Sequence, residues 1–191
     1  MKIGLLDIET TDLEADRGFI LCASFKLHGK KSLIYTTRID DDPKYRSINK
    51  KTGLVNLFDD SVCIRAIYQW IEDERPDFLV TYNGGFFDLP YINARLAIIS
   101  RKTLPVFRHI DHYRTSKFYL KLHSKSLDTL ARHLQIVERK TWYDISTWRR
   151  AEFGSTPDLD LIVKHCEIDV RVLEECHDRV VPLLKTIRGI S

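Results

Sequence analysis

The segment LLDIETTDL, Leu5 to Leu13, decides how the rest of this sequence is interpreted. It overlaps the short apolar run KIGLLDI (2–8), whose composition predicts a buried strand that ends in acidic residues. Asp7 and Glu9 are two residues apart, so on a strand both side chains point to the same face. Neighbouring carboxylates repel each other unless a cation lies between them. The pattern therefore indicates either a metal site or the solvated end of a strand.

A second acidic position follows a turn in the segment TYNGGFFDLP (81–90). The run Asn83-Gly84-Gly85 is a strong turn signal, and Asp88 stands where a helical pattern begins. Asp88 is therefore a candidate metal ligand, or else the N-cap of that helix. Of Phe86 and Phe87, we expect at least one to belong to the core.

The third segment, KHCEIDV (164–170), lies in the last predicted helix. His165 and Asp169 are four residues apart and so share one helix face, either as a hydrogen-bonded pair or as part of a catalytic site. Taken together, the three segments contribute four carboxylates, in the order Asp7, Glu9, Asp88 and Asp169 along the chain. Such a set can bind two divalent cations, one activating water and one stabilising the leaving oxygen of a phosphodiester. Oxygen ligands suit Mg²⁺ or Mn²⁺.

The remaining pattern predicts an α/β domain spanning residues 1–191. Apolar and β-branched residues at 18–26 and 32–38 predict a hairpin that turns near Gly29, and 39–60 is expected to be a long loop. Asp158 is expected to cap the last helix, and Pro182 to end or kink it. The sequence thus predicts a mixed sheet of about five strands flanked by helices. The further strands are expected at 77–82 and 108–111, and the helices at 63–71, 89–100, 125–134 (opened by Ser126) and 157–184.

Composition excludes some classes of protein but does not identify the function. The net charge of +3 excludes a strong overall positive field, so contact with nucleic acid would depend on local basic patches and bound metal. The four cysteines form no C-x-x-C pair, and no apolar run is long enough for a membrane span. We expect a cytoplasmic protein with reduced thiols, no signal peptide and no membrane partner.

Three motifs make the sequence resemble the DEDD superfamily of 3′→5′ exonucleases, which includes polymerase proofreading domains. They are DIETT (7–11), YNGGFFDLPY (82–91) and HCEIDV (165–170), and KSLDTLARHLQI (125–136) between them also resembles the family. The resemblance implies a ribonuclease H-like fold, a site for two divalent cations, Mg²⁺ or Mn²⁺, and stepwise release of nucleoside 5′-monophosphates from a 3′ end. By motif position it assigns the metal ligands to Asp7, Glu9, Asp88 and Asp169.

One position departs from the family pattern. The family has a branch with Tyr four residues before the last Asp and a branch with His five residues before it. This chain has His165 at the tyrosine spacing, and Lys164 at the other. A histidine with a pKa near 6.5 can act as general base more readily than a tyrosine with a pKa near 10. We therefore expect His165 to be catalytic, by holding or deprotonating the attacking water.

A single strand is bound by stacking on aromatic rings and by basic side chains along its backbone. The stretch FRHIDHYRTSKFYLKLHSK (107–125) supplies both, with Arg114 and Lys117 as candidate contacts. Its alternative interpretation is a solvated, partly stranded loop whose aromatic residues face the core. The basic stretch KYRSINKK (44–51) is a second candidate for substrate contact.

The resemblance adds positions next to the carboxylates. It implies that Thr10, Thr11 and Leu13 contact the terminal nucleotide. Asn83, with Phe86 or Phe87, is likewise placed to touch the substrate near Asp88.

Two other clusters resemble functional sites, but the sequence favours a structural role for each. HIDH (109–112) looks like a metal cluster, but on a strand His112 faces away from His109 and Asp111, which argues against a separate site. The tryptophans of KTWYDISTWRR (140–150) can stack bases, yet large indoles more commonly close a core, here under the last helix.

The sequence therefore favours a 3′→5′ exonuclease acting on single-stranded nucleic acid with a free 3′ end, with DNA favoured over RNA. An RNA-trimming exonuclease uses the same chemistry, and a nucleic-acid-binding or polymerase-associated module without catalysis is a third interpretation. A DNA polymerase or another replication or repair protein is a candidate partner in trans. Proofreading, repair and degradation would all use this chemistry.

Overall fold

The structure is a computed structural model that describes residues 1–37, 47–48, 55–56, 60–139 and 141–188. Five strands form one mixed sheet in the order β3-β2-β1-β6-β7. β1 pairs antiparallel with β2 and parallel with β6, so it is the central strand. These strands are β1 (Ile3–Thr10), β2 (Ile20–Leu27), β3 (Leu33–Thr36), β6 (Phe78–Thr81) and β7 (Arg108–Asp111); β4 (Ser47–Ile48) and β5 (Val55–Asn56) form a separate pair.

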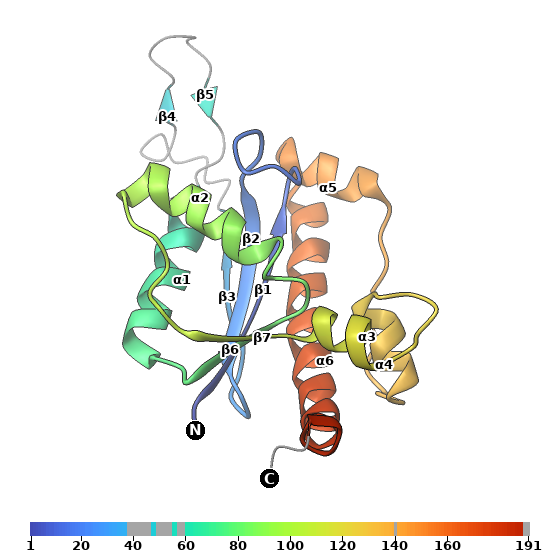
Figure 1. Ribbon diagram of the computed structural model, residues 1–191. Helices are drawn as coiled ribbons and strands as arrows, with labels where there is room; N and C mark the ends of the chain where they lie inside the picture. The colour runs from blue at the N-terminus through green and yellow to red at the C-terminus, as the bar shows by residue number, and fades with distance from the viewer. Residues whose placement is uncertain (38–46, 49–54, 57–59, 140, 189–191) are drawn as a thin grey trace.

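Helices cover both faces of this sheet (Figure 1). One face is covered by α1 and α2, and the other by the long helix α6 together with α4 and α5. The helices are α1 (Ser61–Glu74), α2 (Asp88–Ser100), α3 (His112–Tyr119), α4 (Leu127–His133), α5 (Ile145–Glu152) and α6 (Thr156–Arg188). The predicted mixed sheet of five strands flanked by helices is confirmed. Ser126 is the N-cap of α4, and its hydroxyl accepts from the Thr129 backbone N–H.

Alternation along β1 divides its side chains between the two layers. Leu6 and Ile8 pack in the cluster formed with α1 and α2, whereas Leu5 packs in the cluster formed with α4 and α6. Since side chains on a strand alternate between faces, Asp7 and Glu9 share the α6 side with Leu5. The sequence therefore puts its two neighbouring carboxylates directly under the longest helix.

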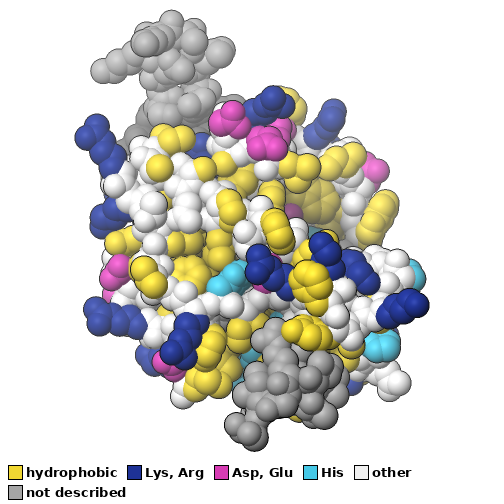
Figure 2. Space-filling model, in the orientation of Figure 1, with side chains coloured by type: hydrophobic (Ala, Val, Ile, Leu, Met, Phe, Trp, Pro, Cys, Tyr) yellow, Lys and Arg dark blue, Asp and Glu magenta, His cyan; other side chains and the backbone are white. Residues whose placement is uncertain are grey.

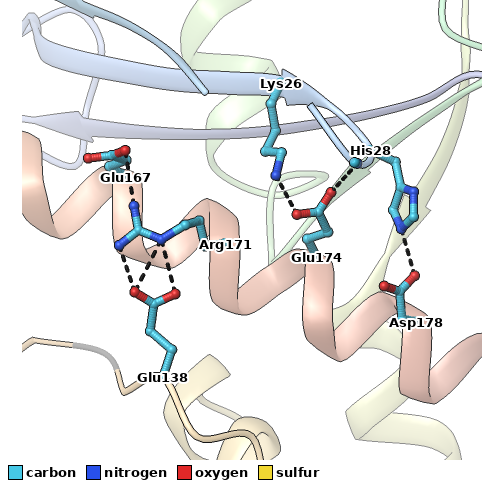
Figure 3. A network of polar contacts seen from close by, with 8 residues as sticks. Lys26, His28, Glu138, Glu167, Arg171, Glu174 and Asp178 are labelled. Carbon is cyan, nitrogen blue, oxygen red and sulfur yellow. Dashed lines mark hydrogen bonds and ion pairs between the residues drawn. The ribbon is translucent and has the colours of Figure 1, made fainter. Parts of the chain in front are cut away.

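Polar contacts also join α6 to the β2–β3 turn (Figure 3). Glu174 accepts from the buried Lys26 and from the Gly29 backbone N–H, and His28 contacts Asp178 with 2.7 Å between Nε2 and Oδ1. On the same helix, Arg171 forms a bidentate ion pair with Glu138 and a second ion pair with Glu167. These charge-assisted contacts hold α6 in one register against the sheet.

Several local predictions need correction. Asp158 does not cap α6, because the helix begins at Thr156 and Asp158 lies in its first turn, where it binds Arg150 and Ser155. Pro182 does not end the helix, which continues to Arg188. The partly stranded loop weighed for 107–125 is wrong over 112–119, which form α3.

The long loop expected at 39–60 contains the short strands β4 and β5, whereas the basic stretch 44–51 lies largely outside the described residues. All four cysteines are buried and free, as expected for reduced thiols. Within the described part of the chain, no helix combines the length and the apolar character needed to cross a bilayer.

Two buried histidines join α3 to α6. His112 Nε2 lies 2.9 Å from His177 Nδ1, and both residues are almost fully buried. Burial, with a smaller effect from His177, lowers the pKa of His112 from 6.5 to about 3, and burial also lowers the pKa of His177. In the folded state both rings are therefore neutral at pH 7.

This pair predicts acid-dependent stability. Below pH 6.5 the unfolded chain takes up protons on these histidines, whereas the folded pair stays neutral. The free energy of unfolding should therefore fall as pH drops, by about 1 kcal/mol per pH unit for His112 alone, with a further decrease from His177. Urea unfolding at several pH values between 7.5 and 5 measures this slope. The His112→Phe/His177→Leu double variant should show a shallower slope; an unchanged slope would contradict the assignment.

A buried ion pair connects β2, α1 and α2. Asp60, only 1% exposed, accepts two hydrogen bonds of 2.8 Å from the Arg95 guanidinium and one of 3.1 Å from the Ile20 backbone N–H. Because Asp60 is also the N-cap residue of α1, this one carboxylate aligns a strand and two helices.

Removing Arg95 should leave a buried carboxylate without its main counter-charge. We expect Arg95→Met to lower the free energy of unfolding by about 3 kcal/mol, measured by urea unfolding. Arg132→Met is the matched control, because Arg132 is 69% exposed and its pair with Asp128 should contribute less than about 1 kcal/mol. Equal losses in the two variants would show that the Asp60–Arg95 pair has no special role.

Candidate active site

The β6–α2 turn brings Asp88 to the central strand. Asn83 adopts a left-handed conformation with φ of 65°, and a Cβ on Gly84 would collide with the Thr81 side chain, so the turn favours the N-G sequence found there. Asp111 holds the turn by accepting from the backbone N–H groups of Asn83 (2.8 Å) and Gly85 (3.2 Å).

Asp88 follows this turn as the first residue of α2 and is 4% exposed. Its Oδ1 accepts from the backbone N–H of Ile8 at 3.2 Å, which places the carboxyl group beside the strand between Asp7 and Glu9. The alternative interpretation of Asp88 as an N-cap is wrong, because Phe87 occupies the N-cap position and no side chain caps the helix.

His165 and Asp169 come to the same place from α6. His165 Nε2 lies 3.7 Å from Glu9 Oε1 and 3.9 Å from Asp169 Oδ2. Ligand atoms of Glu9, His165 and Asp169 all lie within 4.8 Å of one another. Asp7 and Asp169 together line a neighbouring pocket. The structure thus places all five predicted catalytic residues at one end of β1, where β1, α2 and α6 meet.

Residues 141–148, which lead into and begin α5, complete the surroundings of His165. Thr141 Oγ1 lies 2.6 Å from His165 Nδ1, and the rings of Tyr143 and Trp148 contact the imidazole at centroid distances of 5.9 and 5.6 Å. The Trp148 indole N–H also donates to Glu9 Oε2 at 2.9 Å.

The sequence pattern does not predict these contacts. Trp148 packs against the core cluster under α6, as predicted, but Trp142 is 86% exposed, so the core interpretation of that tryptophan is wrong. Nothing in the spacing links residues 141–148 to Glu9, since Trp148 and Glu9 are 139 positions apart.

Two pockets flank the carboxylates. The first, which we call the Glu9 pocket, has a volume of about 440 Å³. The second, the Asp7 pocket, has a volume of about 280 Å³ and also contains Asp169 and Lys125. Of the predicted substrate residues, Thr10, Thr11, Leu13 and Phe87 line the Glu9 pocket, and Asn83 lines the Asp7 pocket.

A surface of alternating aromatic and basic residues continues from the Asp7 pocket. Tyr113, which lines that pocket, contacts the exposed ring of Phe86, and the Arg114 guanidinium lies 5.5 Å from the Phe86 centroid. Lys117 Nζ lies 5.6 Å from the ring of Phe118, which is 68% exposed. Figure 2 shows Lys and Arg side chains interleaved with hydrophobic ones on the face over α3. We call these five residues the α3 surface.

The HIDH segment forms no metal cluster with the described residues. His109 Nε2 contacts Thr81 Oγ1 at 2.8 Å, Asp111 holds the β6–α2 turn, and His112 is paired with His177. Within the part of the chain that the structure describes, Glu9, His165 and Asp169 are the only candidate metal cluster found.

Known proteins resemble this chain in sequence. A family model described as the RNase_H superfamily matches residues 5–181. The catalytic subunit of DNA polymerase epsilon from Emericella nidulans is 26% identical over 138 residues, which are 65% of this chain and 6% of that protein. Its counterpart from Schizosaccharomyces pombe is 32% identical over 103 residues, 48% of this chain and 5% of that protein.

Similarity of fold extends over nearly the whole chain. The structure of the family B DNA polymerase from the hyperthermophilic archaeon Pyrobaculum calidifontis matches 96% of this chain and 25% of its own, with a TM-score of 0.74 and 17% identity. The chain therefore spans only a small part of the length of these proteins. The predicted ribonuclease H-like fold and the resemblance to the DEDD superfamily are confirmed. Since the family model covers all three acidic motifs, this chain belongs to the RNase H superfamily.

Proposed function

We propose that this protein is a metal-dependent 3′→5′ exonuclease that hydrolyses phosphodiester bonds at the 3′ end of single-stranded nucleic acid. The observation that carries the proposal is the convergence of Asp7, Glu9, Asp88 and Asp169 from three distant segments on one end of β1. Membership of the RNase H superfamily and similarity to DNA polymerase catalytic subunits support a nuclease.

The donor set fits divalent cations. Asp88 and Asp169 are buried and Asp7 and Glu9 are partly buried. Neighbouring carboxylates in such surroundings repel one another, and a cation offsets this repulsion. Carboxylate oxygens suit Mg²⁺ or Mn²⁺, which when bound polarise the phosphodiester and lower the pKa of a coordinated water. Within this arrangement Asp7, Glu9, Asp88 and Asp169 would hold the ions. The Ile8–Asp88 and Trp148–Glu9 hydrogen bonds orient two of these carboxylates.

The α3 surface supports a single strand as substrate. Exposed aromatic rings stack on unpaired bases, and basic side chains contact phosphates. The α3 surface adjoins the Asp7 pocket through Tyr113, so a strand bound along it would deliver its end to the carboxylates. Thr10, Thr11 and Leu13 in the Glu9 pocket would then contact the terminal nucleotide.

DNA is the favoured substrate, because the relatives in sequence and structure are DNA polymerases. The same relatives support a DNA polymerase or another replication or repair protein as a partner in trans, with proofreading or repair as the role. The chain matches only a small fraction of each polymerase. A polymerase partner is therefore proposed and does not follow from the matches alone.

Cleavage of a 5′-labelled single-stranded DNA tests the proposed activity. With Mg²⁺ or Mn²⁺ the wild-type protein should produce a descending ladder from the 3′ end, which chelator abolishes. Asp7→Asn should lower the rate by about a thousandfold, because metal-based stabilisation is worth several kcal/mol.

Asp160→Asn, an exposed acid on α6, is the matched control and should retain the wild-type rate. Full activity of Asp7→Asn would contradict the assigned centre. If the wild-type protein cut neither DNA nor RNA of the same sequence, the non-catalytic binding module would replace the exonuclease. A faster reaction with RNA would favour the RNA-trimming alternative.

Binding of a fluorescent single strand in the presence of chelator tests the α3 surface. We expect Arg114→Ala/Lys117→Ala to weaken binding and to reduce the dependence of log K on log salt by about 0.7 per lost phosphate contact. Phe86→Ala should cost about 1–3 kcal/mol through lost stacking, without changing the salt dependence. Lys2→Ala, at an exposed pair with Glu74, is the control. Losses no larger than in this control would exclude the α3 surface as the strand-binding face.

A further inference from the structure

The spacing around His165 is compatible with ligands that share one ion. Two atoms bound to the same ion can lie no further apart than twice the bond length, about 4.2 Å for bonds of about 2.1 Å. His165 Nε2 lies 3.7 Å from Glu9 Oε1 and 3.9 Å from Asp169 Oδ2, distances longer than hydrogen bonds but within this limit. These spacings allow the imidazole nitrogen to share one ion with either carboxylate.

The other ring nitrogen of His165, Nδ1, has an oxygen partner of the kind found beside metal-bound histidines. A histidine that binds metal through one ring nitrogen usually donates its other N–H to an oxygen, which fixes the tautomer and the ring orientation. Thr141 Oγ1, 2.6 Å from Nδ1, is placed to accept that hydrogen bond. With the proton on Nδ1, the lone pair of Nε2 points toward Glu9 and Asp169.

Neighbouring rings hold this arrangement in place. His165 is 4% exposed, and Trp148 and Tyr143 contact its ring at centroid distances of 5.6 and 5.9 Å. Trp148 also binds Glu9 Oε2, which directs the other carboxylate oxygen of Glu9 toward His165. The orientation of both candidate ligands is thus set before any ion binds.

We propose that His165 Nε2 is itself a metal ligand, so that this centre has mixed nitrogen and oxygen donors and selects Mn²⁺ over Mg²⁺. Mg²⁺ prefers oxygen donors, whereas an imidazole favours transition-metal ions, and Mn²⁺ also accepts the carboxylates. This inference rests on the proposed function and revises the sequence-based role for His165, because a nitrogen bound to metal does not serve as a base toward water. Thr141 is then a positioning residue for the metal ligand.

The test is metal binding itself, measured without substrate. Mn²⁺ added to the wild-type protein should give a pulsed EPR spectrum with coupling to a ¹⁴N nucleus, and His165→Gln should lose that coupling. His28→Gln removes a more exposed histidine on the β2–β3 turn and should retain the coupling. By calorimetry, His165→Gln should weaken Mn²⁺ binding at least tenfold while changing Mg²⁺ binding less than threefold. Thr141→Val should weaken Mn²⁺ binding about 10–100-fold, and Thr141→Ser should restore it.

The outcomes separate this inference from the proposed function. Mn²⁺ binding with oxygen donors alone, or ¹⁴N coupling that persists in His165→Gln, would overturn the nitrogen ligand and leave the carboxylate centre intact. Equal affinity of the wild-type protein for Mn²⁺ and Mg²⁺ would overturn the selectivity. If neither ion bound to the wild-type protein, both the nitrogen ligand and the metal-dependent exonuclease would be rejected.

Discussion

Repulsion between Asp7 and Glu9 is the constraint around which the site is organised. Both carboxylates project from the central strand of the sheet toward α6, where a hydrophobic layer would otherwise close. Charged groups in such a place are stable only with compensating partners. The chain supplies an indole N–H and an imidazole close to Glu9, and adds Asp88 and Asp169. Placing Asp88 and Asp169 beside two other carboxylates is favourable when cations bind between them.

The sheet order explains how distant segments reach this point. β1 lies between antiparallel β2 and parallel β6, so the turn that leaves β6 emerges at the same end as Asp7 and Glu9. That turn delivers Asp88 to the backbone of Ile8, and Asp111 at the end of β7 fixes the turn. α6 packs against one face of the same sheet, anchored by its contacts with the β2–β3 turn and Glu138. Its register decides which of its residues face β1.

In the proposed function, recognition of a strand would depend on local surfaces, because the net charge is only +3. The α3 surface combines exposed rings with Arg114 and Lys117, and it borders the Asp7 pocket. On the other side, the Glu9 pocket is mostly apolar, with Trp142 and Ile145 among its lining residues. The carboxylates thus lie between the α3 surface, proposed to bind the strand, and the Glu9 pocket, proposed to hold the terminal nucleotide.

The sequence by itself determined the mixed sheet, the acidic motifs and their order, because alternation, helical spacing and turn residues are local signals. Those signals put Asp7 with Glu9 and His165 with Asp169, but they act only between near neighbours. The contacts of Thr141 with His165 and of Trp148 with Glu9 join residues 24 and 139 positions apart, and only packing of the α5 region against α6 creates them. Local signals also led to wrong predictions of a buried Trp142 and of a loop at 112–119, which form α3. Burial and folding of such segments depend on what the rest of the fold places nearby. The tertiary structure alone decided that His165 faces the carboxylates with its Nε2, because that orientation is set by long-range partners.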